Sequence, residues 1–114
     1  SFLKKDFHYQ HDLKPARLMQ GENEDEQILA YNCVGLSRED IKVTVKTERG
    51  VDYLQIEGYR KDRYNLEFSI KNSFMIRKHI DVDKISATVE NGVLYIKLTV
   101  KDEFKNKEKS VSIS

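Results

Sequence analysis

The sequence contains very little cysteine, proline or long apolar stretch. One cysteine, Cys33, stands among 114 residues, so an internal disulfide is impossible and a disulfide-stapled secreted scaffold is excluded. No apolar run approaches the roughly 18 residues of a membrane-spanning helix, and Ser1–Lys5 lacks the apolar stretch of a signal peptide. We therefore expect a cytoplasmic, reducing environment and no membrane partner.

The chain also lacks an excess of charge of either sign. Twenty Lys and Arg residues face 19 Asp and Glu residues, for a net charge of +1. Nucleic-acid binding that relies on phosphate contacts needs a field of one sign, so we expect no nucleic-acid partner. Charged residues make up 34% of the chain, above the roughly 25% of an ordinary domain, which predicts a well-solvated surface.

Residue patterns typical of catalysis or metal binding are missing as well. His8 and His11 are three positions apart, but no third ligand is near them in sequence, and a structural zinc site needs four ligands at recognisable spacings. No Ser-His-Asp order, glycine-rich phosphate loop or paired-carboxylate motif occurs. Cys33 lies within a strand-like run, where a buried inert thiol is the common case. We expect no enzyme activity, no cofactor and no metal.

What the chain does contain is alternation of apolar and polar residues with a period of two, which predicts strands with one buried face. Asn91-Gly92 predicts a type I′ hairpin turn, because both residues tolerate a positive φ. Ser37 followed by two acids predicts one short capped helical turn. Short strands at this spacing favour an all-β fold, an antiparallel β-sandwich. The expected strands cover residues 27–34, 41–45, 53–57, 64–70, 73–80 and 94–100.

Five segments carry a resemblance to a known family. Ala87–Leu94 has the pattern A-x-x-x-x-G-V-L, and Ile80–Ile85 resembles the usual lead-in to that pattern. Gly35–Val43 and Leu54–Arg60 resemble the family's turn after its third strand and its fifth strand. Val111–Ile113 matches a terminal I/V-x-I/V motif. Taken together in their order along the chain, over roughly residues 15 to 114, these segments resemble the α-crystallin domain of small heat-shock proteins.

The resemblance implies an immunoglobulin-like β-sandwich at residues 15–101, a short N-terminal arm at 1–14, and a C-terminal linker and V-x-I tail at 102–114. It also implies an ATP-independent holdase chaperone, which binds partially unfolded proteins and prevents their aggregation. As partners we expect further copies of the chain, as dimers and larger oligomers, and unfolding client proteins. The alternative is a non-chaperone sandwich module of the co-chaperone type that binds one folded partner.

The tail and a groove form the first expected site. Residues i and i+2 of an extended chain point to the same side, so Val111 and Ile113 can enter two adjacent pockets while their backbone extends a sheet edge. The resemblance implies a receiving groove between residues 41–46 and 85–90. Its candidate residues are Val43, Val45, Ile85, Ala87 and Val89. The alternative for each is an ordinary core position, which is the more common case for any single one of them.

Two further sites concern the dimer and the arm. The strand at 64–70, which Lys71-Asn72 separates from the next one, resembles a strand exchanged between subunits; the alternative is an ordinary hairpin within one subunit. The residues of this exchange site would be Tyr64, Leu66, Phe68, Ile70 and Arg77. The arm would either contact clients or have no role; its candidate residues are Phe2, Leu3, Phe7 and Tyr9.

Overall fold

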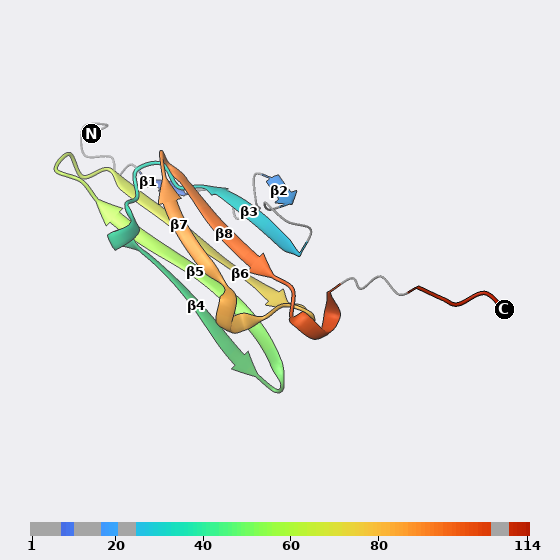
Figure 1. Cartoon of the computed structure of the whole chain (residues 1–114). Helices are drawn as coiled ribbons and strands as arrows, with labels where there is room; N and C mark the ends of the chain where they lie inside the picture. Colours follow the sequence, from blue (N-terminus) through green and yellow to red (C-terminus); the bar gives the residue numbers. More distant parts are fainter. Residues whose placement is uncertain (1–7, 11–16, 21–24, 106–109) are drawn as a thin grey trace.

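Two four-stranded sheets pack face to face in a β-sandwich (Figure 1). The computed structural model describes residues 8–10, 17–20, 25–105 and 110–114. All strand neighbours are antiparallel except β1 and β6, which run parallel. One sheet has the order β1-β6-β5-β4 and the other β2-β3-β8-β7. The strands are β1 (His8–Gln10), β2 (Arg17–Gln20), β3 (Glu26–Asn32), β4 (Ile41–Glu48), β5 (Val51–Lys61), β6 (Glu67–Ile76), β7 (Ser86–Glu90) and β8 (Val93–Thr99).

Two of the predicted turns form where the sequence places them. Asn91 and Gly92 have φ angles of 50° and 77°, which confirms a hairpin turn with two positive φ values between β7 and β8. The helical turn after Ser37 is the 3-10 helix η2 (Arg38–Asp40), and both the amide and the hydroxyl of Ser37 donate hydrogen bonds to the Asp40 carboxylate. Two more 3-10 helices are η3 (Val82–Lys84) and η4 (Asp102–Phe104).

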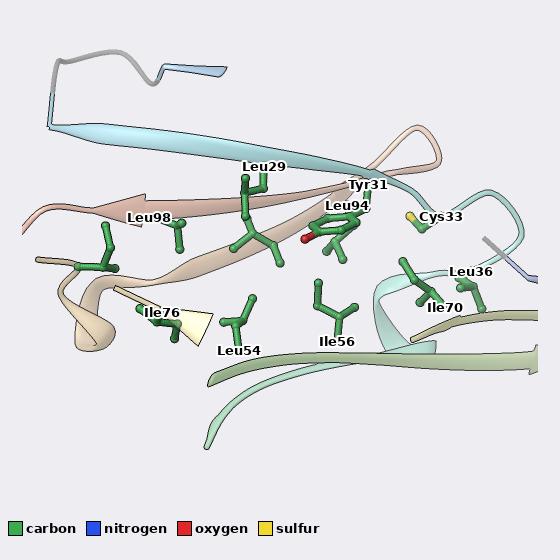
Figure 2. Packing of buried hydrophobic residues seen from close by; sticks show 12 residues of the cluster. Leu29, Tyr31, Cys33, Leu36, Leu54, Ile56, Ile70, Ile76, Leu94 and Leu98 are labelled. Atoms are coloured by element: carbon green, nitrogen blue, oxygen red, sulfur yellow. The ribbon is translucent and has the colours of Figure 1, made fainter. Parts of the chain in front are cut away.

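The core lies between the sheets and is built from the inward residues of both (Figure 2). Because side chains alternate along a strand, Leu54 and Ile56 of β5 face Leu94 and Ile96 of β8. Burial raises the pKa of the Cys33 thiol, which keeps it protonated and unreactive at neutral pH. The side chains that are almost fully buried are Tyr31, Cys33, Leu54, Ile56, Ile70, Leu94 and Ile96.

The predicted break at Lys71-Asn72 is wrong. β6 runs unbroken from Glu67 to Ile76 and pairs along its whole length with β5 of the same chain. Asn72 faces inward and donates a hydrogen bond of 3.3 Å to the Tyr31 hydroxyl of the opposite sheet. A polar residue that resembled a turn signal is therefore part of a polar pair across the core. In this chain β6 forms an ordinary hairpin with β5, and exchange between subunits stays a prediction.

Two short strands at the N-terminal side were not predicted. β2 pairs with β3, and β1 pairs with the first three residues of β6 through His8↔Glu67, Tyr9↔Phe68 and Gln10↔Ser69. β1 lies within the segment expected to be a free arm. It leaves residues 70–76 of β6 with one unpaired edge in the part of the chain that the structure describes.

Candidate functional site

A groove lies between the two edge strands β4 and β7. Each is the last strand of its own sheet, and between them is a hollow of about 450 Å³. Leu94 of β8, 1% exposed, belongs to its wall and to the core. The residues that line the groove are Arg38, Ile41, Val43, Ala87, Thr88, Val89 and Leu94.

The alternation of side chains along β4 and the small side chain of Ala87 on β7 explain this hollow. Ile41 and Val43 are two positions apart, so both point to the same side, where they pack half-buried against the core. Val89 does the same from β7. Ala87 carries only a methyl group, and that leaves space above the core between the two strands.

The groove also has unpaired backbone on both sides. β4 forms its ladder with β5, and β7 forms its ladder with β8. Within the described ranges, no further strand pairs with either of them. Exposed edges present rows of unpaired N–H and C=O groups that can accept an added strand. The groove therefore offers both backbone pairing and an apolar wall to an extended segment.

Three of the five predicted groove residues line the hollow: Val43, Ala87 and Val89. Val45 does not; it is exposed further along β4. Ile85 lies just before β7 and packs, half-buried, against the core.

The prediction missed four residues of the lining. Ile41 continues the alternation of Val43, so its position was readable from the sequence. Leu94 is opposite Val89 in the β7–β8 register, and that pairing follows from the Asn91-Gly92 turn. No pattern in the sequence indicated that Arg38 and Thr88 would line the groove.

The tail motif lies away from the sandwich (Figure 1). Val111 is 80% and Ile113 98% exposed. The chain between them and β8 contains η4, and Lys105 just after η4 pairs through its Nζ with Asp102 Oδ1 at 2.8 Å. Two large apolar side chains are therefore presented to solvent on an extended segment.

The residues predicted for exchange and for the arm are scattered. Tyr64 is exposed in the β5–β6 turn, and Arg77 is exposed in the loop after β6. Ile70 is buried in the chain's own core, and Phe68 packs half-buried against that core. Leu66 is half-buried just before β6. Tyr9 belongs to β1, whereas Phe2, Leu3 and Phe7 lie outside the described residues.

The described residues contain neither a metal-ligand cluster nor a membrane-spanning helix. No group of three or more His, Cys, Asp or Glu side chains is placed to hold a metal ion in that part of the chain. No helix formed by those same residues is long and apolar enough to cross a membrane.

Comparisons with known proteins agree on one group. A model of the Hsp20/alpha crystallin family matches residues 20–114. Stress-induced protein 1 from Caenorhabditis elegans superposes with a TM-score of 0.58 at 16% identity, covering 86% of this chain and 98% of that one. Heat shock protein 16.0 from Schizosaccharomyces pombe superposes with a TM-score of 0.56 at 21% identity, covering 94% of this chain and 77% of that chain.

A small heat-shock protein from Xylella fastidiosa gives a TM-score of 0.57 at 21% identity, covering 85% of this chain and 95% of that chain. A search of curated proteins found no match to this sequence. At these identities the solved structures establish the fold, and the family match covers the strands that build the groove.

Proposed function

The chain belongs to the Hsp20/alpha crystallin family, and from that premise we propose that it is an ATP-independent holdase chaperone. It binds partially unfolded proteins, prevents their aggregation, catalyses no reaction and assembles with further copies of itself. Its buried, protonated thiol Cys33 suits a reducing, cytoplasmic environment. The observation that carries this proposal is the open groove between β4 and β7 in a chain whose tail carries two exposed apolar side chains.

The tail of one subunit docks in the groove of another. Val111 and Ile113 are about 7 Å apart in an extended chain, and both point to one side. Fully burying a side chain of this kind stabilises a complex by about 1.5–3 kcal/mol. Two such side chains, together with backbone pairing on an open edge, support a reversible contact that other segments can displace.

Clients use the same surface when the tail leaves it. An unfolding protein exposes extended apolar segments, and such a segment can pair with β4 while its side chains contact Val43, Ala87 and Val89. Competition between tail and client is an equilibrium between two ligands, so no nucleotide is needed to drive it. We assign Phe2, Leu3, Phe7 and Tyr9 a supporting role in client contact.

A second open edge supports the dimer. β6 is unpaired on its outer side over residues 70–76 among the residues described. An antiparallel copy of the same edge can pair with it, because identical edges related by a twofold axis are self-complementary. Arg77 follows this edge. We propose that the dimer forms through β6 and that the tails then link dimers.

The decisive test is the native mass, by light scattering, of the intact chain and of a Val111→Ala, Ile113→Ala double variant. We expect the intact chain to be an assembly of dimers and the double variant to be a dimer. The control is Ser110→Ala with Ser112→Ala, which changes the same segment but keeps the apolar pair; it should remain assembled. If both the intact chain and the double variant are monomers, the assembly proposal fails.

Holdase activity is tested separately by the turbidity of reduced, aggregating insulin. The intact chain should suppress aggregation in proportion to its amount. A Val43→Asp variant places a charge in the groove and should lose most of that suppression, whereas Thr44→Asp, its neighbour on the other face of β4, should keep it. Equal suppression by both variants would remove the groove from client binding.

A further inference from the structure

A second hollow lies at the other end of β4, where the β4–β5 turn meets the end of β6. Its volume is about 460 Å³, within the range of about 300–1,000 Å³ that ligand pockets occupy. A smaller hollow of about 250 Å³ adjoins it and shares Asp52, Lys78 and Phe104 with it. We call the larger one the β6-end site; its principal residues are Val51, Met75, Ile76, Arg77, Lys78, His79 and Phe104.

The walls of the β6-end site are apolar and open to water. Met75 is 57% and Phe104 52% exposed, although both line the same hollow. Ile76 is buried beneath them, and Val51 is half-buried beside them. Large apolar side chains that gather at a concave surface and remain exposed mark an interaction site.

The rim of the site is basic. Arg77 and Lys78 are exposed in the loop after β6 and form no ion pair with any carboxylate that the structure describes. His79 follows them. The one acid in the lining, Asp52, already accepts a hydrogen bond from the Thr47 hydroxyl. A ligand that brings carboxylates would therefore find unpaired cations beside the apolar walls.

The chain places an acidic and aromatic segment of its own beside this surface. Phe104 forms the wall common to both hollows, and Glu103 lines the smaller one. Both belong to η4, whose sequence is Asp-Glu-Phe. η4 is held in place by main-chain hydrogen bonds, from Phe104 N to Lys101 O at 2.9 Å and from Lys101 N to His79 O at 2.8 Å. An acidic segment that ends in an aromatic ring therefore lies at the border between the two hollows.

We propose that the β6-end site binds extended acidic peptide segments that carry an aromatic or large aliphatic side chain. The apolar side chain lies between Met75 and Phe104, and the carboxylates of the segment face Arg77 and Lys78. The groove between β4 and β7 has one charged residue in its lining, Arg38, and suits uncharged apolar pairs. The two sites therefore select different segments of an unfolding protein.

The test is fluorescence anisotropy with a fluorescein-labelled peptide, Gly-Ser-Asp-Glu-Phe-Ser-Gly, and the full chain. We expect saturable binding. A peptide with two lysines in place of the acids, and one with alanine in place of Phe, should each bind about tenfold more weakly. The double variant Arg77→Glu, Lys78→Glu should weaken binding of the acidic peptide about tenfold, because each exposed carboxylate–cation contact contributes a factor of a few.

Lys71→Glu is the control, because Lys71 is an exposed cation that lies on β6 and does not line the site. This variant should bind the peptide as the unchanged chain does. Met75→Ser provides a second variant that leaves the charges intact and should also weaken binding. Three outcomes would each overturn the proposal. The acidic peptide does not bind saturably, all three peptides bind equally, or the double variant Arg77→Glu, Lys78→Glu binds the acidic peptide as the unchanged chain does.

The tail variant Val111→Ala, Ile113→Ala separates this proposal from that of the holdase groove. It should bind the acidic peptide with unchanged affinity. Tighter binding would mean that the tail and the peptide compete for one groove, and the β6-end site would then be wrong even if the holdase assignment stands.

Discussion

The two ends of the sandwich are built in opposite ways. At the end where β5 meets β6, the β3–β4 loop folds over the sheets and is fixed by one arginine. At the other end, where the chain leaves β8, Met75 and Phe104 stay exposed around a hollow. We refer to these as the latched end and the open end.

Arg60 fixes the latched end through several contacts, which we call the latch. Its Nε donates a hydrogen bond to the carbonyl oxygen of Gly35, and its guanidinium lies 5.2 Å from the centre of the Phe68 ring. The Asp40 carboxylate is 3.9 Å away; it also accepts from Ser37 and so caps η2. β4 begins at Ile41. The latch therefore sets where one wall of the groove starts, whereas the open end is where we propose the β6-end site.

The largest expected effect is at Gly35. It has a φ of +89°, and a Cβ there would come within 2.3 Å of the Phe68 ring. Gly35→Ala should therefore combine backbone strain of about 1–2 kcal/mol with overpacking of about 1–3 kcal/mol, a loss of ~3 kcal/mol in unfolding free energy. Denaturant unfolding at one fixed protein concentration measures this loss.

Gly50→Ala is the natural control for that variant. Gly50 has a similar φ of +76°, but nothing lies within 4 Å of its Cβ position. Gly50→Ala should lose only the stability that backbone strain costs, about 1 kcal/mol of unfolding free energy. If the two variants lose the same stability, the close contact between Gly35 and Phe68 contributes nothing and the latch is weaker than its geometry indicates.

Arg60→Ala should have the second largest effect. It removes the donor to the Gly35 carbonyl and the contact with the Phe68 ring, for a loss of about 2 kcal/mol. The Asp40 pair adds little, because the Arg60 side chain is 40% exposed. Arg63→Ala removes a similar cation–ring contact, with Tyr64 at 4.8 Å, in an exposed turn and should cost less than about 0.5 kcal/mol. Equal losses at the two arginines would contradict the latch.

The latch also shows where reasoning from sequence ends. The strands and the Asn91-Gly92 turn follow from local alternation and turn chemistry, and Val43, Ala87 and Val89 of the groove follow from them together with the resemblance. Arg60 and Gly35 are 25 positions apart in sequence, so no local pattern links them. A hydrogen bond of this kind depends on how a loop folds over a finished sheet.

Asn72 illustrates a different limit. Lys71-Asn72 has the composition of a turn, and the break predicted there was a reasonable interpretation of local chemistry. The inward orientation of Asn72 is stabilised by the Tyr31 hydroxyl, which comes from the other sheet. Whether a polar residue ends a strand or pairs across a core is decided by a partner that the neighbouring sequence does not contain.

The pair in the middle of the sandwich gives the third prediction. Tyr31→Phe removes the acceptor of the Asn72 side chain and should lower stability by about 1 kcal/mol, less than either change at the latched end. Burial raises the pKa of Tyr31, and the hydrogen bond from Asn72 lowers it by less. Ile56→Val, a nearby core change that leaves the pair intact, is the control for packing loss alone.

The same variant carries a pH signature. Because the pKa of Tyr31 is higher in the folded chain than in the unfolded one, the unfolded state releases its proton first as pH rises. The contribution of Tyr31 is therefore fully present below pH of about 10, its ordinary pKa, and is lost as the pH rises above that value. Between pH 8 and 11, the free energy of unfolding should fall less steeply with pH for Tyr31→Phe than for the unchanged chain. Identical slopes would mean that the Tyr31 hydroxyl reaches water.

The smallest stability change belongs to the open end, and it sharpens the comparison most. Met75 and Phe104 are both more than half exposed, so Met75→Ser and Phe104→Ala remove little buried area and should each change unfolding free energy by less than about 0.5 kcal/mol. The same two variants should weaken binding of the acidic peptide severalfold. A large stability loss at Phe104 would show that η4 closes the sandwich as firmly as Arg60 closes the other end. The two ends would then differ in composition and not in their freedom to bind.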